Sequence, residues 1–292
     1  MHGKTVLITG GSSGIGAATA RALAGMGAAV VIVSRNEARC KAVVEQIGAE
    51  TGNHQLDYIV ADLSSLEAVR AAAERFRSRH DRLDVLINNA GGIFMSRQLS
   101  VDGLEMTFAL NHMSYFLLTN LLLDVLRASA PARVVNVASN AYRGATLDLD
   151  DLQMTRRYSG FAAYARSKLM NILFTYELAR RLVGTGVTAN ALHPGFVASN
   201  FGLNNGQPWK ALIRLTQRFG ISPVAGARTL VYLASSPEVE GVTGQYFVRN
   251  QAIQTAPITY DWALAARLWE VSAALAGLQD HAPEFISDTQ AA

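Results

Sequence analysis

Short apolar runs alternate with longer segments of helical period along most of this chain. The apolar runs are predicted to be strands: Thr5–Thr9, Ala29–Ser34, Leu56–Ala61, Val85–Asn88, Arg133–Ala138, Val187–Leu192 and Gly244–Val248. The predicted helices are Ile15–Met26, Glu37–Ile47, Leu66–Arg79, Leu104–Leu126, Ala162–Leu182 and Ala225–Ala234. Apolar strands separated by helices are typical of a parallel sheet covered on both faces. The sequence therefore predicts an α/β fold with a doubly wound, mostly parallel sheet of seven strands, whose ligands bind beyond the carboxyl ends of the strands.

The domain organisation is simple. The chain has 292 residues and shows no repeat, low-complexity tract or linker, which suits one α/β domain over residues 1–278. Residues 199–222 depart from the alternation, because Gly202, Gly206 and Pro208 precede an apolar and basic stretch. We expect residues 199–222 to be an insertion on the substrate side, and residues 279–292 to be a loosely held tail.

The composition excludes several classes of protein. The formal net charge is only +3 and the basic residues are scattered, which does not suit nucleic-acid binding. No run approaches the roughly 18 apolar residues of a membrane span. The first strand follows Lys4 directly and leaves no room for a signal peptide. Cys40 is the single cysteine, so it forms no intrachain disulfide and is expected to be a packed thiol. These observations favour a cytoplasmic location, and no metal site is predicted.

A glycine-rich turn, Thr9–Gly16, joins the first strand to the first helix. Glycines let the backbone turn sharply and approach a pyrophosphate, and the free amides of a helix start favour its negative charge. A tight connection needs glycine in any case, so the turn alone is weak evidence. The strand–turn–helix context makes a Rossmann-type dinucleotide site the better interpretation.

The second strand ends at Ser34 and Arg35. An enzyme that selects NAD normally places a carboxylate at this point, where it binds the ribose hydroxyls. The first acid, Glu37, comes only in the following helix. Ser34 and Arg35 instead suit a 2′-phosphate, with which an arginine pairs through two charge-assisted hydrogen bonds. The sequence therefore predicts NADP(H). The alternative is that Arg35 is an ordinary surface arginine, but the missing carboxylate argues against it.

Tyr164 and Lys168 lie four residues apart in a predicted helix and share one of its faces. A tyrosine has an ordinary pKa near 10, and a neighbouring ammonium group favours the phenolate that a general base needs. A tyrosine and a lysine at this spacing usually lie on the exposed surface of a helix and have no catalytic role. Ser139, which follows a strand directly, could hold a substrate oxygen or merely cap a turn. Asn111 lies inside an apolar helix, where a polar side chain must find hydrogen-bond partners. It could support proton supply to Lys168, or it could be a core asparagine whose hydrogen bonds are all formed within the protein.

These residues together resemble the single-domain branch of the short-chain dehydrogenases/reductases over nearly all of residues 4–250. The turn Thr9–Gly16 matches the T-G-x-x-x-G-x-G form of that family. The resemblance implies a catalytic tetrad of Asn111, Ser139, Tyr164 and Lys168. It also implies cofactor contacts from Gly10, Ser12, Ser13, Gly14, Ile15, Gly16, Ser34, Arg35, Asn36, Asp62, Leu63, Asn89, Ala90, Gly91, Tyr164, Lys168, Pro194, Gly195, Val197 and Ser199.

Several stretches are similar to the retinol-dehydrogenase-like group, which WW-domain oxidoreductases and light-dependent protochlorophyllide reductases also resemble. These stretches are Leu83–Gly91, Asp102–Glu105, Asn111–His112, Ser167–Phe174 and Gly186–Gly195. The wide gap between Ser139 and Tyr164 also fits that group.

The resemblance predicts an NADP(H)-dependent oxidoreductase that interconverts a carbonyl and an alcohol. Ser139 and Tyr164 would bind the oxygen, Lys168 would orient the nicotinamide ribose, and Asn111 would support proton resupply. Apolar side chains expected at the mouth indicate an apolar small-molecule substrate: Phe94, Met95, Phe161, Phe196, Phe201, Leu203, Trp209 and Leu212. Two alternatives stay open, a C=C reductase similar to protochlorophyllide reductase and a cofactor-binding regulatory protein without turnover. A homo-oligomer is compatible with the sequence.

Overall fold

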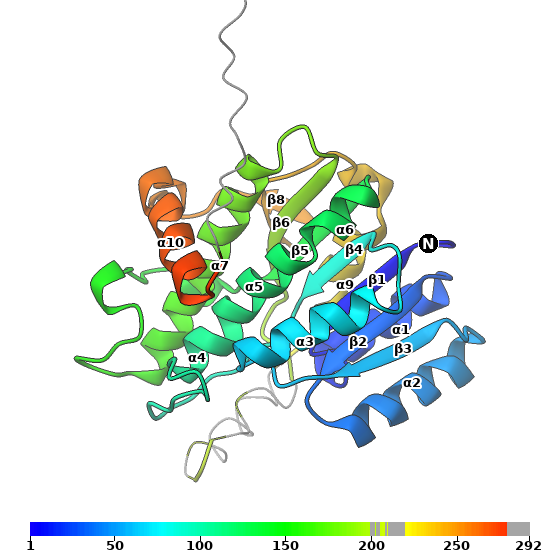
Figure 1. Ribbon diagram of the computed structural model, residues 1–292, viewed down its shortest axis with the longest axis horizontal. Coiled ribbons are helices and arrows are strands. Elements are labelled where there is room, and N and C mark those ends of the chain that lie inside the picture. The colour runs from blue at the N-terminus through cyan, green and yellow to red at the C-terminus, as the bar shows by residue number, and fades with distance from the viewer. Residues whose placement is uncertain (199–201, 203–204, 208, 210–219, 279–292) are drawn as a thin grey trace, which may run out of the picture.

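An eight-stranded sheet forms the centre of the computed structural model, which describes residues 1–198, 202, 205–207, 209 and 220–278 (Figure 1). The strands lie in the order β3-β2-β1-β4-β5-β6-β7-β8, and all neighbours are parallel except β7 and β8. Their bounds are β1 Thr5–Thr9, β2 Ala29–Ser34, β3 Leu56–Val60, β4 Val85–Asn88, β5 Ala132–Val137, β6 Val187–His193, β7 Tyr246–Val248 and β8 Gln251–Ile253. The doubly wound, mostly parallel sheet is confirmed, with eight strands in place of seven.

The additional strand, β8, is the second arm of a tight hairpin. Arg249 and Asn250 form the two-residue turn after β7, and both have positive φ, 52° and 64°. A two-residue hairpin of this kind needs the left-handed region at both positions, for which Asn-Gly is the usual sequence. Because arginine stands at the first position, the sequence carried no clear signal for β8.

Helices cover both faces of the sheet (Figure 1). Residues that alternate along β1 point to opposite faces, so Leu7 lies in one core and Val6 and Ile8 lie in the other. The core around Val6 is closed by α1 Gly14–Gly25, α2 Glu37–Thr51 and α9 Pro223–Ser235. The core around Leu7 is closed by α3 Leu66–Arg77, α5 Ser114–Leu121, α7 Gly160–Arg181 and α10 Trp262–Leu275.

The prediction of one continuous helix over Leu104–Leu126 is wrong. The segment consists of the short helix α4 Met106–Phe108, a π-helical turn, η1 Ala109–Met113, and then α5. Leu122, with φ −104° and ψ 5°, separates α5 from α6 Leu123–Ala128. π-Helical turns are rare and occur mostly at functional sites. The apolar periodicity predicts helix correctly here, but it cannot show the extra residue in the turn.

The C-terminal helix α10 was not predicted from the sequence. Asp261 caps its start by accepting a hydrogen bond from the backbone N–H of Leu264, at 2.9 Å. The ring of Trp269 stacks on Phe174 of α7 and meets Phe116 of α5 edge-on, with centroids 5.8 and 4.9 Å apart. Helix α10 therefore packs over the part of the core that lies beneath the tetrad.

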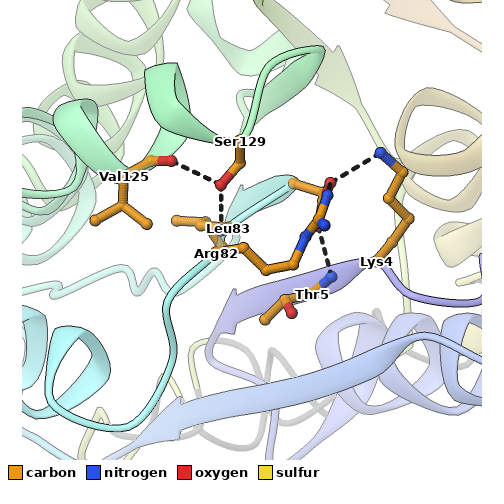
Figure 2. A network of polar contacts seen from close by, with 7 residues as sticks. Lys4, Thr5, Arg82, Leu83, Val125 and Ser129 are labelled. Carbon is orange, nitrogen blue, oxygen red and sulfur yellow. Dashed lines mark hydrogen bonds and ion pairs between the residues drawn. The ribbon is translucent and has the colours of Figure 1, made fainter.

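An ion cluster around the buried Asp84 closes the amino ends of β1 and β4 (Figure 2). Asp84 accepts hydrogen bonds from Lys4, Arg82 and the backbone N–H of Thr5, at 2.9, 2.6 and 2.8 Å. Burial by itself raises the pKa of the Asp84 carboxyl, but these three bonds outweigh it and lower the pKa below its usual value. Ser129, also drawn in Figure 2, lies beside this cluster. This end of the sheet is opposite to the one where the predicted site residues gather.

Candidate active site

The glycine turn between β1 and α1 is held in a tight form by its neighbours. Gly10 and Gly14 have positive φ, 68° and 55°, which favours glycine. A Cβ on Gly16 would collide with the carbonyl oxygen of Gly10. Ser13, at the start of α1, makes no side-chain capping bond within the described part of the chain. The first amides of α1 are thus available to an anion such as a pyrophosphate.

The residues after β4 are hydrogen-bonded to Thr9, at the start of this turn. The side-chain oxygen of Thr9 accepts hydrogen bonds from the backbone N–H groups of Asn89 and Ala90, at 2.8 and 3.0 Å. The amide of Asn89 donates to the backbone oxygen of Thr9 at 2.8 Å. Asn88, by contrast, points into the core and donates to Thr119 and Asn136. Asn89 and Ala90 therefore line the turn, whereas Asn88 stabilises the sheet.

The end of β2 brings Ser12 and Ser34 together, with 2.7 Å between their hydroxyl oxygens. Arg35 follows with an exposed side chain. Asn36 caps α2 and accepts a hydrogen bond from the backbone N–H of Arg39, at 2.9 Å. The pair of hydroxyls, the arginine that follows in the chain and the absence of a carboxylate on β2 suit a phosphate group. The side-chain oxygen of Asn36 caps a helix, and the contact of Asn36 with the cofactor stays a prediction.

The turn after β3 holds Asp62 and the buried Leu63. The carboxylate of Asp62 accepts hydrogen bonds from the backbone N–H and the hydroxyl of Ser64, at 3.0 and 2.8 Å. Asp62 thus shapes its own turn at the same edge of the sheet.

The π-helical turn η1 places Asn111 against the loop after β4. Its Oδ1 accepts a hydrogen bond from the Gly92 N–H at 2.8 Å, and its Nδ2 donates to the Gly92 carbonyl oxygen at 2.9 Å. Nδ2 also donates to the hydroxyl of Ser167, at 2.9 Å. Asn111 therefore joins η1, the loop and helix α7 into one unit. Gly91 leaves space here, because a Cβ at that position would lie 3.2 Å from Asn111 Oδ1.

Ser139, Tyr164 and Lys168 meet at the carboxyl end of β5. The hydroxyl of Ser139 forms a hydrogen bond with that of Tyr164, and it also accepts a bond from the Ala141 N–H at 3.2 Å. Lys168 is buried and donates to the carbonyl oxygen of Val137 at 2.8 Å. Its Nζ lies 5.6 Å from the centre of the Tyr164 ring. The four tetrad residues predicted from the sequence thus lie around one point of the sheet edge.

Burial dominates the electrostatics of the pair. It raises the pKa of Tyr164 to about 12, although the bond from Ser139 acts in the opposite direction. Burial lowers the pKa of Lys168 to about 7. The protein alone therefore holds a protonated Tyr164 beside an amine that titrates near neutral pH. The predicted effect of the charged lysine and of the oxidised cofactor on Tyr164 stays a prediction.

The segment after β6 carries Pro194 and Gly195, and Gly195 has a φ of 94°. Val197 forms a bridge with Ile221, in which the Ala198 N–H donates to the Ile221 carbonyl oxygen at 2.9 Å. The bridge joins the two ends of the predicted insertion. Phe196 is exposed. Ser199, Phe201, Leu203 and Leu212, and the tail 279–292, lie outside the described residues.

The loop after β4 is held from two sides by residues that the sequence did not single out. Asn205 accepts a hydrogen bond from the Met95 N–H at 2.7 Å and donates to the Ile93 carbonyl oxygen at 2.9 Å. Tyr158 donates to the Phe94 carbonyl oxygen at 2.7 Å, and its hydroxyl lies 3.0 Å from the buried Glu105. Since the three bonds to Ile93, Phe94 and Met95 reach backbone atoms, no motif in the sequence could have revealed them. Loop 92–96 is therefore a fixed wall of the site.

Comparison with known proteins identifies the family to which the chain belongs. A model of the short chain dehydrogenases matches residues 4–208. The chain belongs to this family. Human retinol dehydrogenase 14 is 45% identical over 294 residues, covering 95% of this chain and 88% of the relative. This short chain dehydrogenase is therefore an oxidoreductase of the alcohol and carbonyl class, within the retinol-dehydrogenase-like group.

Solved structures agree with this assignment. A protein from Mycobacterium paratuberculosis is 33% identical, covers 95% of each chain and has a TM-score of 0.76. A short chain dehydrogenase from Burkholderia cenocepacia, in complex with NADP, is 29% identical, with 84% of this chain and 96% of that chain covered and a TM-score of 0.68. A membrane-spanning helix is not found among the residues that the structure describes here.

Proposed function

We propose that this protein interconverts a carbonyl and an alcohol on an apolar small molecule, with NADP(H) as cofactor and Tyr164 as the general acid and base. The observation that carries the proposal is the bond between the hydroxyls of Ser139 and Tyr164 above the buried amine of Lys168. Two hydroxyls this close together can share a single substrate oxygen, and Tyr164 lies near an amine that can pass a proton.

The residues present fit the cofactor. The uncapped start of α1 and the close approach at Gly16 suit a pyrophosphate. Ser12, Ser34 and Arg35 suit a 2′-phosphate, and this supports NADP(H) over NAD(H). The solved relative from Burkholderia cenocepacia, which is complexed with NADP, supports the same choice. The hydride is supplied or accepted by the bound cofactor.

In the reductive direction, the hydroxyls of Ser139 and Tyr164 hold the carbonyl oxygen, and Tyr164 gives its proton as that oxygen becomes a hydroxyl. A pKa of about 12 keeps Tyr164 protonated and ready for this step. Lys168, with a pKa of about 7, can gain and lose a proton near neutral pH and so can resupply the tyrosine. Asn111 holds the loop at Gly92 against helix α7, and this keeps Tyr164 and Lys168 of that helix in position.

The substrate is proposed to be apolar. Phe161 and Trp209 stand exposed near each other, with ring centroids 6.1 Å apart, and Phe196 is exposed after β6. Exposed aromatic side chains at the mouth of a site favour an apolar ligand. The similarity to retinol dehydrogenase 14, named for an apolar alcohol, points the same way.

The test is Tyr164→Phe, with turnover of ketones, aldehydes and retinol-like alcohols followed by the absorbance of the reduced nicotinamide. We expect a loss of at least about 100-fold, because general acid–base catalysis contributes that much or more, while NADPH binding measured by fluorescence is retained. Full activity of the variant would refute the assignment of Tyr164. Saturation of the C=C bond of an enone in preference to its carbonyl would favour a C=C reductase instead. A wild-type protein that binds NADPH but turns over nothing in the panel would favour a regulatory role.

A further inference from the structure

His112, the neighbour of Asn111 on η1, is a fully buried polar side chain that the proposed reaction does not use. Its ring stacks on Phe108 at 5.5 Å between centroids and meets Phe174 edge-on at 6.3 Å. Its Nε2 lies 2.8 Å from the hydroxyl of Ser272, which comes from the C-terminal helix α10. A histidine enclosed by aromatic rings therefore connects the tetrad-bearing turn to a helix 160 residues further along the chain.

The other side of the imidazole faces Asn171 of α7. Burial lowers the pKa of His112 to about 3, and the nearby Asn171 amide raises it only in part, so the ring is neutral. A neutral imidazole has one N–H donor and one acceptor. Within the described part of the chain, neither His112 Nδ1 nor Asn171 Oδ1 has a hydrogen-bond partner. The hydrogen bond between Nε2 and the hydroxyl of Ser272 is therefore the one that holds the ring in place.

Asn171 lies near the backbone oxygen that binds Lys168. Its Nδ2 lies 3.5 Å from the carbonyl oxygen of Val137, which is the same oxygen that accepts the 2.8 Å bond from Lys168. Val137 ends β5, two residues before Ser139. His112 is thus joined to the site by the peptide bond to Asn111, and it also lies beside Asn171, which shares the Val137 carbonyl oxygen with Lys168.

We propose that His112 is a positioning residue for the reaction, held in place by Ser272 of α10. The hydrogen bond to Ser272 fixes the register of the π-helical turn, and so the direction in which Asn111 meets Gly92. His112 also lies beside Asn171, whose Nδ2 is 3.5 Å from the Val137 carbonyl oxygen that Lys168 binds. His112 touches neither substrate nor cofactor. This inference rests on the proposed function, because it assumes that the tetrad performs the reaction.

The first test is the double variant His112→Phe/Ser272→Ala, which fills the aromatic enclosure and removes both polar partners together. We expect kcat for carbonyl reduction to fall by about 10- to 100-fold, since small misplacement of catalytic groups has effects of that size. The pH profile of kcat should shift, whereas the KM for substrate and the dissociation constant of NADPH should stay within about threefold of wild type. An unchanged kcat and pH profile in the folded variant would overturn the proposal.

Ser129→Ala is the matched control. Ser129 is also a buried serine with two hydrogen bonds, from the Leu83 N–H at 2.9 Å and to the Val125 carbonyl oxygen at 2.8 Å (Figure 2). It lies at the opposite end of the sheet, so its loss should lower stability without changing kcat or the pH profile. An equal fall of kcat in Ser129→Ala would mean that any loss of core polarity slows the enzyme, and this too would overturn the proposal.

A second pair of variants covers the case in which the double variant fails to fold. Ser272→Ala removes only the hydroxyl and should lower kcat about threefold or more, an amount that a single hydrogen bond commonly contributes. Ser272→Thr keeps the hydroxyl and should restore kcat. Equal kcat in wild type and Ser272→Ala would overturn the proposal. Tyr164→Phe, measured alongside, separates the proposed function from the proposed role of His112. If Tyr164→Phe stays active, the proposed function fails. If Tyr164→Phe is inactive while the His112 and Ser272 variants keep wild-type kcat, only the role of His112 fails.

Discussion

The buried, neutral His112 should make the stability of the protein depend on pH. Its pKa is 6.5 in an unfolded chain and about 3 in the folded one. The unfolded state therefore binds a proton below pH 6.5 that the folded state does not take up, and the free energy of unfolding falls as the pH falls from 6.5 toward 3. Between pH 7 and pH 5 this linkage amounts to about 2 kcal/mol. The stabilisation is fully present above pH 6.5.

The assay is urea unfolding at pH 7, 6 and 5, followed by far-ultraviolet circular dichroism. His112→Phe should lose about 2 kcal/mol less than wild type between pH 7 and pH 5, because it lacks the group that titrates. Burial also lowers the pKa of His193, but this contribution is common to both proteins and cancels. Ser272→Ala keeps the buried histidine and should behave like wild type. An identical pH dependence in His112→Phe would refute the reasoning, since the histidine would then not be buried in neutral form.

Three further substitutions test other parts of the site. Arg35→Asp should raise the KM for NADPH by about 10- to 100-fold, the amount expected for a lost charge-assisted bond, and improve use of NADH; a wild type that already prefers NADH would contradict the prediction. Gly16→Ala should weaken NADPH binding by about tenfold or more, because the added Cβ collides with Gly10 where the backbone must approach the pyrophosphate; fluorescence titration measures this, and unchanged affinity would count against the placement of the cofactor. Asn205→Ala leaves the Met95 N–H without its partner and should raise the KM for apolar substrates several-fold with little change in NADPH affinity, so steady-state kinetics showing equal KM values would exclude a role in the substrate wall.

The residues at the strand ends were the predictable part of the site. Gly10, Ser139 and Tyr164 lie within or directly after strongly periodic segments, and parallel strands bring their carboxyl ends to one edge of the sheet. The mostly parallel sheet and the meeting of the four tetrad positions therefore followed from local pattern and the family resemblance.

The parts that could not be predicted depend on contacts between distant segments. Helix α10 has apolar residues around much of its surface, and only its packing on Phe116 and Phe174 explains them. The π-helical turn has the same apolar spacing as an ordinary helix. Asn205 acts through backbone atoms of loop 92–96, which any sequence would provide. In each case the determining partner lies far away in the sequence, so no local signal exists.

The bridge between Val197 and Ile221 has a consequence for how such an enzyme can change its substrate range. Ile221 donates from its backbone N–H to the Phe196 carbonyl oxygen at 2.8 Å, and Ala198 pairs in return, so both ends of residues 199–220 are anchored to the end of β6. The cost of closing a loop grows only slowly with its length once its ends are held. We therefore expect residues 199–220 to tolerate exchange for the corresponding segment of a relative, provided that Asn205 and its bonds to loop 92–96 are kept. Such an exchange would test whether this segment sets the substrate range, because the bridge holds the chain on either side of it in place.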